Sequence, residues 1–334
     1  MQSRALVITS IAGDAHPVLV DYALQAPRHG TAFIVVGDTK SPAVFSLTGC
    51  DFYSIDRQEG LPFELARSLP KRHYARKNLG YLVAIQSGVD VIIETDDDNL
   101  PREEFWAERT RSKPARLVDA AGWVNVYRYF SQQNIWPRGF ALERLLDPTP
   151  ECHAPRFLDC PIQQGLADEN PDVDAIYRLT APLPINFENS PAVALGAGSI
   201  CPFNSQNTTW FREAFPLLYL PSYCSFRMTD IWRSFVAQRI CWGLGWPILF
   251  HGSTVWQERN AHDLMADFRA ELVGYENNLK IMESLVQLEI SANPAQIGDS
   301  LLSCYEALIR LSLVEKSELS LLQAWLDDLR SISG

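Results

Sequence analysis

Residues 89–99, VDVIIETDDDN, decide the prediction of the fold. The run VDVIIE has the apolar, β-branched character of a strand that is buried on both faces, as in a parallel sheet covered by helices. It leads directly into three consecutive aspartates, and Pro101 ends the loop that follows. The acidic residues therefore stand at the carboxyl end of a sheet strand, which is where ligands bind in open α/β sheets.

The sequence upstream predicts the rest of an α/β unit. Residues 5–10 (ALVITS) and 31–37 (TAFIVVG) read as two further buried strands, and residues 17–25 between them have helical spacing. Residues 75–87 predict the helix before the acidic strand, and Gly88 is suited to end it. The order predicts a β–α–β beginning with a right-handed crossover.

The sequence downstream changes in character. Residues 148–207 are rich in Pro, Asn and Gly and read as loops and short strands around a site. Residues 229–242 predict a helix that Thr229 caps and that Gly243 follows.

Beyond residue 262 the apolar residues recur at steps of three and four, which predicts helices. We therefore predict a sheet domain over residues 1–258 and a helical extension over residues 259–334. The extension either packs on the core or forms a homo-oligomer.

Composition excludes several classes of protein. The chain of 334 residues has 40 acidic and 29 basic side chains, a formal charge of −11, which argues against a duplex nucleic-acid binder. No apolar run reaches the roughly 18 residues of a membrane span, and we expect neither a cleaved leader nor a location outside the cytoplasm. The seven cysteines are scattered, and Cys152, His153 and Cys160 lack the second pair of a zinc site.

The three aspartates need a compensating charge. Neighbouring carboxylates repel one another, and a divalent cation relieves the repulsion. Asp96 and Asp98 point to one side of an extended backbone, and Asp97 points to the other, towards a sugar hydroxyl or a backbone amide. Mg²⁺ and Mn²⁺ favour carboxylate oxygens, and Mg²⁺ is commonly shared with substrate phosphates. The alternative is an acidic turn in water.

A basic segment stands just before the acidic strand. Arg76 and Lys77 begin the helix that feeds it, and both basic side chains and helix N-termini suit phosphate groups. Asn78 could hydrogen-bond a base or a ribose. The alternative is a solvated basic face.

These residues carry a resemblance to known proteins. A strand ending in D-x-D within an α/β domain resembles the GT-A fold of nucleotide-sugar glycosyltransferases. Residues 75–99, 165–180 and 201–242 resemble the STELLO family of glycosyltransferase-like proteins. A weaker resemblance links the chain to plant reversibly glycosylated polypeptides, which act as UDP-arabinopyranose mutases. The D-D-D, R-G-Y and D-D-M-W segments of those polypeptides correspond in this chain to residues 96–98, Arg138-Gly139-Phe140 and Thr229-Asp230-Ile231-Trp232.

The resemblance implies a fold, a donor and a metal. It implies a Rossmann-like nucleotide-diphospho-sugar transferase sheet, flanked by helices, that binds a nucleotide sugar with Mn²⁺ or Mg²⁺. Asp96 and Asp98 would hold the metal and its phosphates, with Asp97 also at the nucleotide. The residues implied at the nucleoside are Thr9, Ser10, Ile11 and Asp38. UDP is the expected nucleotide because it is the commonest partner of D-x-D sites.

Two residues are candidates for the catalytic step. Asp230 falls in the first turn of a predicted helix, where the helix dipole stabilises a carboxylate, and could act as the base for an acceptor hydroxyl. By resemblance to the mutases, Arg138 would lie beside the transferred sugar. The alternatives are that Asp230 only caps its helix and that the turn at Gly139 only holds Arg138.

Three later residues complete the candidate site. His251 follows the short strand at residues 246–250 and resembles the late histidine that completes the metal shell in many GT-A enzymes, with His262 as its competitor. Arg259 could reach the diphosphate.

The sequence thus predicts a metal-dependent glycosyltransferase that moves a sugar from a UDP-sugar to a carbohydrate acceptor. The alternatives are a UDP-sugar mutase, which needs no separate acceptor, and a non-catalytic scaffold with a glycosyltransferase shape.

Overall fold

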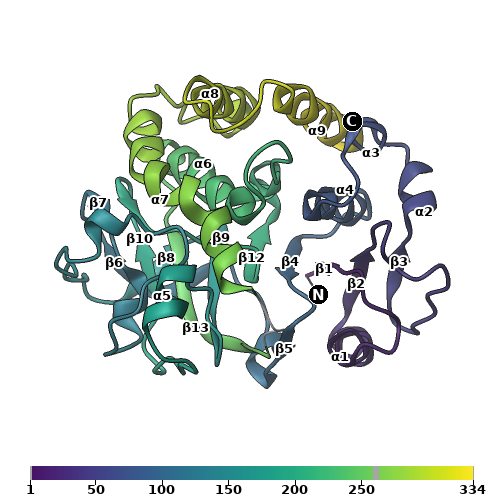
Figure 1. Cartoon of the computed structure of the whole chain (residues 1–334), viewed down its shortest axis with the longest axis horizontal. Helices are drawn as coiled ribbons and strands as arrows, with labels where there is room; N and C mark the ends of the chain where they lie inside the picture. The colour runs from purple at the N-terminus through teal and green to yellow at the C-terminus, as the bar shows by residue number, and fades with distance from the viewer. Residues whose placement is uncertain (1, 259–262, 334) are drawn as a thin grey trace.

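The computed structural model describes residues 2–258 and 263–333. A large mixed sheet forms its centre, and helices pack on both faces of the sheet (Figure 1). Its strands lie in the order β3 (Asp51–Tyr53), β2 (Thr31–Val36), β1 (Arg4–Thr9), β4 (Val91–Thr95), β12 (Asn207–Phe211), β9 (Ile162–Asp168), β13 (Ile248–Gln257), β10 (Val193–Leu195), β6 (Ser112–Val118) and β8 (Arg156–Asp159). β5 (Asn99–Pro101) pairs with β13, and β7 (Gly122–Trp123) pairs with β11 (Ser199–Ile200).

The amino-terminal half of the sheet is parallel. β1 pairs in parallel with both β2 and β4, and β2 pairs in parallel with β3. Alternate residues of β1 face opposite sides: Ala5 and Val7 join one hydrophobic cluster, and Leu6 and Ile8 join the other. The predicted β–α–β unit of strands buried on both faces is confirmed, since the central residues of β1 and β2 are apolar and leave neither face suited to water.

The helices are α1 (Pro17–Gln25), α2 (Ile55–Glu59), α3 (Glu64–Ser68), α4 (Lys77–Gln86), α5 (Ala175–Thr180), α6 (Thr229–Leu244), α7 (Leu264–Val286), α8 (Ile297–Arg310) and α9 (Glu318–Ser333). Two short 3₁₀ turns matter for the site: η2 (Tyr74–Arg76) precedes α4, and η7 (Phe226–Met228) precedes α6. Hydrophobic side chains of α1 pack on one face of the sheet, and those of α4 and α6 pack on the other.

Both ends of α6 differ from the prediction. Thr229 is the first helical residue and not the cap, because the chain is already turning in η7, and its hydroxyl lies 3.4 Å from the carbonyl oxygen of Ser225. The helix runs past Gly243 and ends at Gly245, which adopts a left-handed conformation with φ of 69°. Gly243 instead lets α6 pack closely, since a Cβ there would lie 2.9 Å from Ile290 Cγ2.

The central strand β9 lies inside the stretch that was predicted to hold loops and short strands. Its polar residues hide the strand pattern, yet both glutamines are buried. Gln163 donates to the carbonyl oxygens of Thr110 and Cys160, and Gln164 accepts from the Asn204 amide and the Thr208 hydroxyl. Hydrogen bonding therefore makes these polar side chains as buriable as apolar ones.

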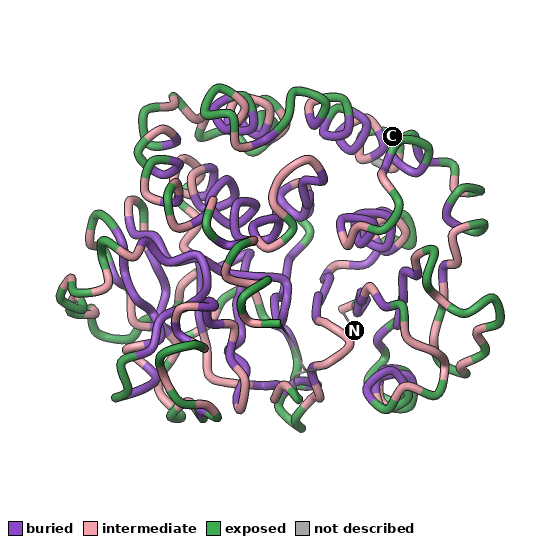
Figure 2. Tube along the Cα trace, viewed as in Figure 1, coloured by how far each residue is buried: buried purple, intermediate pink, exposed green. Residues whose placement is uncertain are grey.

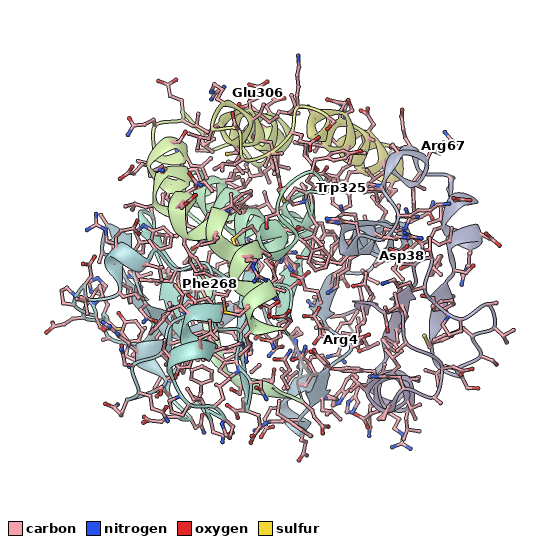
Figure 3. The ribbon with its side chains drawn as sticks, viewed as in Figure 1. Arg4, Asp38, Arg67, Phe268, Glu306 and Trp325 are labelled. Atoms are coloured by element: carbon pink, nitrogen blue, oxygen red, sulfur yellow. The ribbon has the colours of Figure 1, made fainter. Side chains whose placement is uncertain are left out.

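The carboxy-terminal helices pack onto the sheet domain. Trp325 of α9 is fully buried, and its indole nitrogen donates to Pro216 O at 3.1 Å (Figure 3). Asp328 accepts from the amides of Glu64 and Leu65 at the start of α3. Figure 2 shows α8 and α9 with their inner sides buried and their outer sides exposed. The division at residue 258 stays a prediction, while the packing of these helices on the core is observed.

The predicted α/β class is confirmed, with a mixed sheet, flanking helices and a helical carboxy-terminal region. This architecture is consistent with the Rossmann-like glycosyltransferase fold that the resemblance implies. In the part of the chain that the structure describes, every helix is too short or too polar to cross a bilayer.

Candidate functional site

The ends of the parallel strands bring distant residues to one edge of the sheet. Thr9 at the end of β1 is in register with Val36 of β2, and β4 lies on the other side of β1. The segments that follow these strands, at residues 10–11, 37–38 and 96–98, are therefore neighbours. Two adjoining cavities lie there.

The first, here the Asp38 cavity, has a volume of about 350 Å³. Its wall consists of Thr9, Ser10, Ile11, Val36, Gly37, Asp38, Thr39, Lys40, Arg72, His73, Tyr74, Arg76, Asp97 and Phe226. The four residues expected at the nucleoside all lie in this wall, together with Arg76 and Asp97. The ends of the strands thus bring expected residues from four separate segments of the chain into one wall.

Asp38 also shapes the cavity. Its carboxylate accepts hydrogen bonds from the backbone amides of Arg72 and His73, at 2.9 and 3.0 Å. The bonds hold the segment before η2 against the end of β2. Asp38 therefore builds the wall that carries Arg72, His73 and Tyr74.

The second, here the Asp96 cavity, has a volume of about 250 Å³. Its wall consists of Thr9, Tyr74, Asp96, Asp97, Asp98, Arg138, Asp172, Ser205, Gln206, Phe226, Arg227, Asp230 and Gln257. It shares Thr9, Tyr74, Asp97 and Phe226 with the Asp38 cavity, so the two form one continuous site.

The three aspartates have different partners. Asp96 lies 3.3 Å from the ammonium group of Lys77, which is itself fully buried and also donates to Thr95 O at 2.7 Å. Asp97 accepts from the hydroxyl of Ser10. Asp98 accepts from the side-chain amide of Gln257 at 2.8 Å. Asp97 is thus held towards the Asp38 cavity.

The charge on Asp96 is poorly compensated. Burial raises its pKa to about 7 against the opposing effect of Lys77, and Asp98, Asp230 and Asp97 raise it further. The Asp96 side chain is 40% exposed, so the carboxylate is accessible from the cavity. A divalent cation would reverse the shift, because it favours the ionised form.

The two cavities have opposite formal charges. Among the described residues, five aspartates and two arginines line the Asp96 cavity, which gives a formal charge of −3 for this part of the wall. Three basic side chains, Lys40, Arg72 and Arg76, and two aspartates line the Asp38 cavity, which gives +1.

Arg138 joins two aspartates inside the Asp96 cavity. Its guanidinium donates to Asp172 at 2.8 and 2.9 Å and to Asp230 at 2.9 to 3.2 Å. All three residues are largely buried. Although burial alone disfavours its charge, Asp172 and Asp230 together raise the pKa of Arg138 well above its ordinary value. The structure thus brings both catalytic candidates into one ion-pair cluster, which excludes the purely surface role for Arg138.

Asp230 is not free to act as a base in this arrangement. Its Oδ2 also accepts from the amide of Ser205 at 3.2 Å, and Oδ1 accepts from the amide of Ile231 at 3.0 Å. These donors occupy much of the acceptor capacity of the carboxylate. The arrangement is therefore better suited to holding a hydroxyl group than to abstracting its proton.

A second buried ion pair holds α6 against β4. Arg233 donates to Glu94 at 2.8 and 2.9 Å, and both side chains are fully buried. Tyr81 and Trp210 donate to the same carboxylate. Because α6 also carries Asp230, this pair fixes Asp230 relative to the loop after β4.

Some expected residues lie elsewhere. Asn78 is completely buried outside both described walls, and its side chain donates to and accepts from the backbone of Leu220 at 2.8 and 2.9 Å, so it holds the chain together and does not face a nucleotide. Lys77 lies beneath Asp96 and outside both walls. Arg259 and His262 lie outside the described residues.

The structure does not support His251 as a metal ligand. Five residues of β13, with a bulge among them, separate His251 from Gln257, which is the β13 residue that reaches Asp98. Burial, together with the nearby cations Lys113 and Arg109, lowers the pKa of His251 to about 3. Cationic neighbours disfavour a metal ion at this position.

Several wall residues are hard to identify from sequence. Asp172 belongs to an acidic stretch with Asp168, Glu169 and Asp174, of which the sequence predicts that most face solvent and one could bind acceptor hydroxyls, without indicating which. Tyr74, Phe226 and Arg227 sit in 3₁₀ turns, and Gln257 lies far along the chain, so no motif identifies them. Among the described residues no three His, Cys, Asp or Glu side chains are grouped as a ready metal site.

Known proteins are similar to this chain. The family model of the STELLO glycosyltransferases matches residues 227–333. Two Arabidopsis thaliana proteins, named probable glycosyltransferases STELLO2 and STELLO1, are each 32% identical to it, over 252 and 242 residues. These matches cover 68% and 65% of this chain but 32% and 31% of the relatives, so the chain spans about a third of their length.

Among solved structures, a mycobacterial protein matches 91% of this chain and 74% of its own, at 12% identity and a TM-score of 0.38. That likeness is too distant to carry a conclusion. The two plant relatives and the family model agree with each other and with the segments that carried the resemblance. The prediction is confirmed, and over the region that it shares with these proteins the chain belongs to the STELLO-type glycosyltransferase family.

Proposed function

We propose that the chain transfers a sugar from a nucleotide diphosphate sugar, expected to be a UDP-sugar, to a carbohydrate acceptor with the help of a divalent metal. One observation carries the proposal. A weakly basic cavity at the ends of β1 and β2 opens into an acidic cavity that holds the aspartates after β4. A nucleoside fits the first, and a metal with a diphosphate and a sugar fits the second.

The residues of the Asp96 cavity suit a metal shared with substrate. Mg²⁺ is commonly held by one or two carboxylates together with substrate phosphates. Asp96 and Asp98 supply two carboxylates, and the raised pKa of Asp96 marks the charge that a cation would offset. When bound, the metal would stabilise the departing diphosphate as a Lewis acid. A wall with a formal charge of −3 would otherwise repel a diphosphate.

The Asp38 cavity offers donors suited to a nucleoside. Among the described residues, Arg76 Nη2 and the Tyr74 hydroxyl are buried and have no hydrogen-bond partner. Both side chains belong to the wall of this cavity. Buried donors without acceptors are costly, and the oxygens of a base, ribose or phosphate would satisfy them.

The Arg138 cluster would orient the transferred sugar. Sugar hydroxyls are good partners for carboxylates that a guanidinium holds in place. Asp230 and Asp172 stand in the same cavity wall as the candidate metal ligands. In this account Asp230 positions the donor sugar or its acceptor.

Calorimetric titration with UDP, with and without Mn²⁺, tests the proposal. We expect binding that requires Mn²⁺, because the acidic wall needs a cation before it accepts a diphosphate. Binding without metal, or no binding at all, would contradict the proposal and would favour a non-catalytic scaffold.

A mutase is the second candidate, and one contact favours it. Two of the three segments that carry the mutase resemblance meet at the Arg138–Asp230 ion pair. Incubation with a UDP-sugar alone separates the two candidates. A mutase would rearrange the sugar without an acceptor, whereas a transferase would leave it unchanged or hydrolyse it slowly.

A further inference from the structure

One face of α7 is polar although it is buried. Glu271, Gly274 and Asn278 are spaced by three and four residues, so they share a face of the helix. Glu271 is 0% exposed and Asn278 is 1% exposed. A buried charged or amide side chain lowers stability unless its bonds are made, so its partners indicate what it holds in place.

Glu271 holds the wall of the Asp96 cavity from behind. It accepts from Nε and Nη2 of Arg227, at 2.9 and 2.6 Å, and from the amide of Ala175 at 2.7 Å. Arg227 lines the cavity, and its carbonyl oxygen accepts from Nη1 of Arg138. A path of direct contacts therefore leads from α7 through Arg227 to Arg138.

Asn278 contacts two other segments that carry residues of the same cluster. Its amide donates to Gly139 O at 2.9 Å, directly after Arg138 in the chain. Its side-chain oxygen accepts from the indole of Trp232 at 3.0 Å, two residues after Asp230. One side chain of α7 thus ties together the segments that carry both members of the ion pair.

Gly274 allows the close approach that these bonds need. A Cβ at this position would lie 2.4 Å from Sδ of Met228, the last residue of η7. Real Cβ atoms do not approach this closely, so any side chain here would displace Met228 or the helix. The glycine therefore brings α7 onto the turn that carries Arg227.

We propose that α7 is a positioning element of the active site, in which Glu271 and Asn278 fix Arg138 and Asp230 in the geometry that acts on the sugar. The reaction that this geometry serves rests on the proposed function. The positioning itself does not, because it concerns contacts among residues of this chain. Apolar residues could have packed the same face, but they would not have bridged these segments.

The test compares Glu271→Gln and Asn278→Ala with Glu276→Gln, an exposed residue of the same helix. The first readout needs no substrate: the NMR signal of Arg138 Nε–H, identified by its loss in Arg138→Lys. We expect the two buried variants to shift or broaden this signal and the control to leave it unchanged. If the wild type shows no turnover, the proposed function fails while this readout still decides the inference.

The second readout is turnover with a nucleotide sugar, measured per folded molecule. We expect kcat to fall by about tenfold or more, since small misplacements of this kind are costly. KM and the affinity for UDP with Mn²⁺ should stay within about twofold, which a loss of transition-state geometry predicts.

Gly274→Ala provides a variant that removes no hydrogen bond, in case the others fail to fold. We expect it to lower kcat, and Met228→Ala in the same chain to recover it by restoring the space. An Arg138 signal and a kcat equal to those of Glu276→Gln in every folded variant would overturn the inference. So would a Gly274→Ala enzyme that Met228→Ala does not rescue.

Discussion

The Asp38 cavity and the Asp96 cavity share four wall residues, yet the formal charges of their described walls have opposite signs. In the Asp38 cavity three basic side chains face two carboxylates, Asp38 and Asp97, whose donors are backbone amides and the Ser10 hydroxyl. In the described wall of the Asp96 cavity the aspartates exceed the arginines by three. The first can receive a nucleoside as it stands, whereas the second is suited to a diphosphate only together with a cation.

The neighbouring Glu94 shows that this imbalance is local. It lies two residues before Asp96 and is completely buried, but Arg233, Tyr81 and Trp210 satisfy its carboxylate. The fold therefore can neutralise a buried acid on this strand, and it leaves Asp96 poorly compensated. Such departures from charge balance are expected at functional sites.

The largest effect is expected from the acidic loop. Asp96→Asn with Asp98→Asn would remove both carboxylates that the metal needs, and turnover should fall by about a thousandfold, since metal stabilisation of a leaving group is worth several kcal/mol. UDP binding should lose its dependence on Mn²⁺. Calorimetry and a turnover assay measure both. Asp299→Asn, a change at an exposed position in α8, serves as the control. If the double variant had the same turnover and the same Mn²⁺-dependent UDP binding as this control, the two carboxylates would not hold a metal that the reaction needs.

A smaller effect is expected from the ion pair of Asp230 with Arg138, which lies in the same cavity wall as the candidate metal ligands. Asp230→Asn keeps the size of the side chain but removes the charge that pairs with Arg138, and turnover should fall by about a hundredfold. The affinity for UDP with Mn²⁺ should stay near the wild-type value, because the proposal assigns the nucleoside to the Asp38 cavity and the metal with its diphosphate to Asp96 and Asp98, not to Asp230. Steady-state kinetics together with calorimetry separate the two quantities. Unchanged turnover would exclude Asp230 from the reaction.

The pH dependence of metal binding tests the unbalanced carboxyl directly. The pKa of Asp96 is raised to about 7, so below pH 7 a proton competes with the metal and Mn²⁺ affinity should fall by about tenfold per pH unit. Without metal, the free energy of unfolding changes with pH in the opposite direction. Because the pKa of Asp96 is raised in the folded protein, its contribution to stability is greatest at low pH and is lost as the pH rises through about 7. Calorimetry measures the Mn²⁺ affinity, and Asp96→Asn is the control, because neither its Mn²⁺ affinity nor its stability should show this pH dependence. A wild-type Mn²⁺ affinity that stays constant between pH 5 and 7 would contradict the raised pKa of Asp96.

The smallest effect is expected where the cavities join. Phe226 is 54% exposed in a wall that both cavities share, and it packs edge-on against Tyr74. Phe226→Ala should weaken UDP binding by about two- to tenfold, the range of one aromatic contact. Phe157→Ala, at an exposed position on β8, is the matched control. Equal affinities in the two variants would show that the aromatic ring does not contact the nucleotide.

The sequence predicted the half of the site that parallel strands build. Apolar runs identified β1, β2 and β4, the rule that ligands bind at strand ends placed the acidic residues after β4 at a site, and the family resemblance supplied Ser10 and Asp38. The contact between Arg138 and Asp230 was not predictable in this way. It depends on the orientation of α6 and of the loop that carries Arg138, and the second partner of Arg138, Asp172, follows β9, a strand that buried glutamines conceal.

The misplaced residues have specific physical reasons. His251 was placed by analogy at the end of a short strand, but β13 continues to Gln257, and the extra length carries the site away from the histidine. Asn78 looked available for a ligand because a sequence does not show that the side chain is completely buried against the backbone of Leu220. In each case a long-range contact decided the role.

Anomalous diffraction from a crystal grown with UDP and Mn²⁺ tests the central claim most directly. The account predicts one manganese peak at about 2.2 Å from a carboxylate oxygen of Asp96 and of Asp98, and at a similar distance from the diphosphate. The uridine should lie in the Asp38 cavity. A map with no metal between these carboxylates, and with both side chains turned into bulk water, would contradict it.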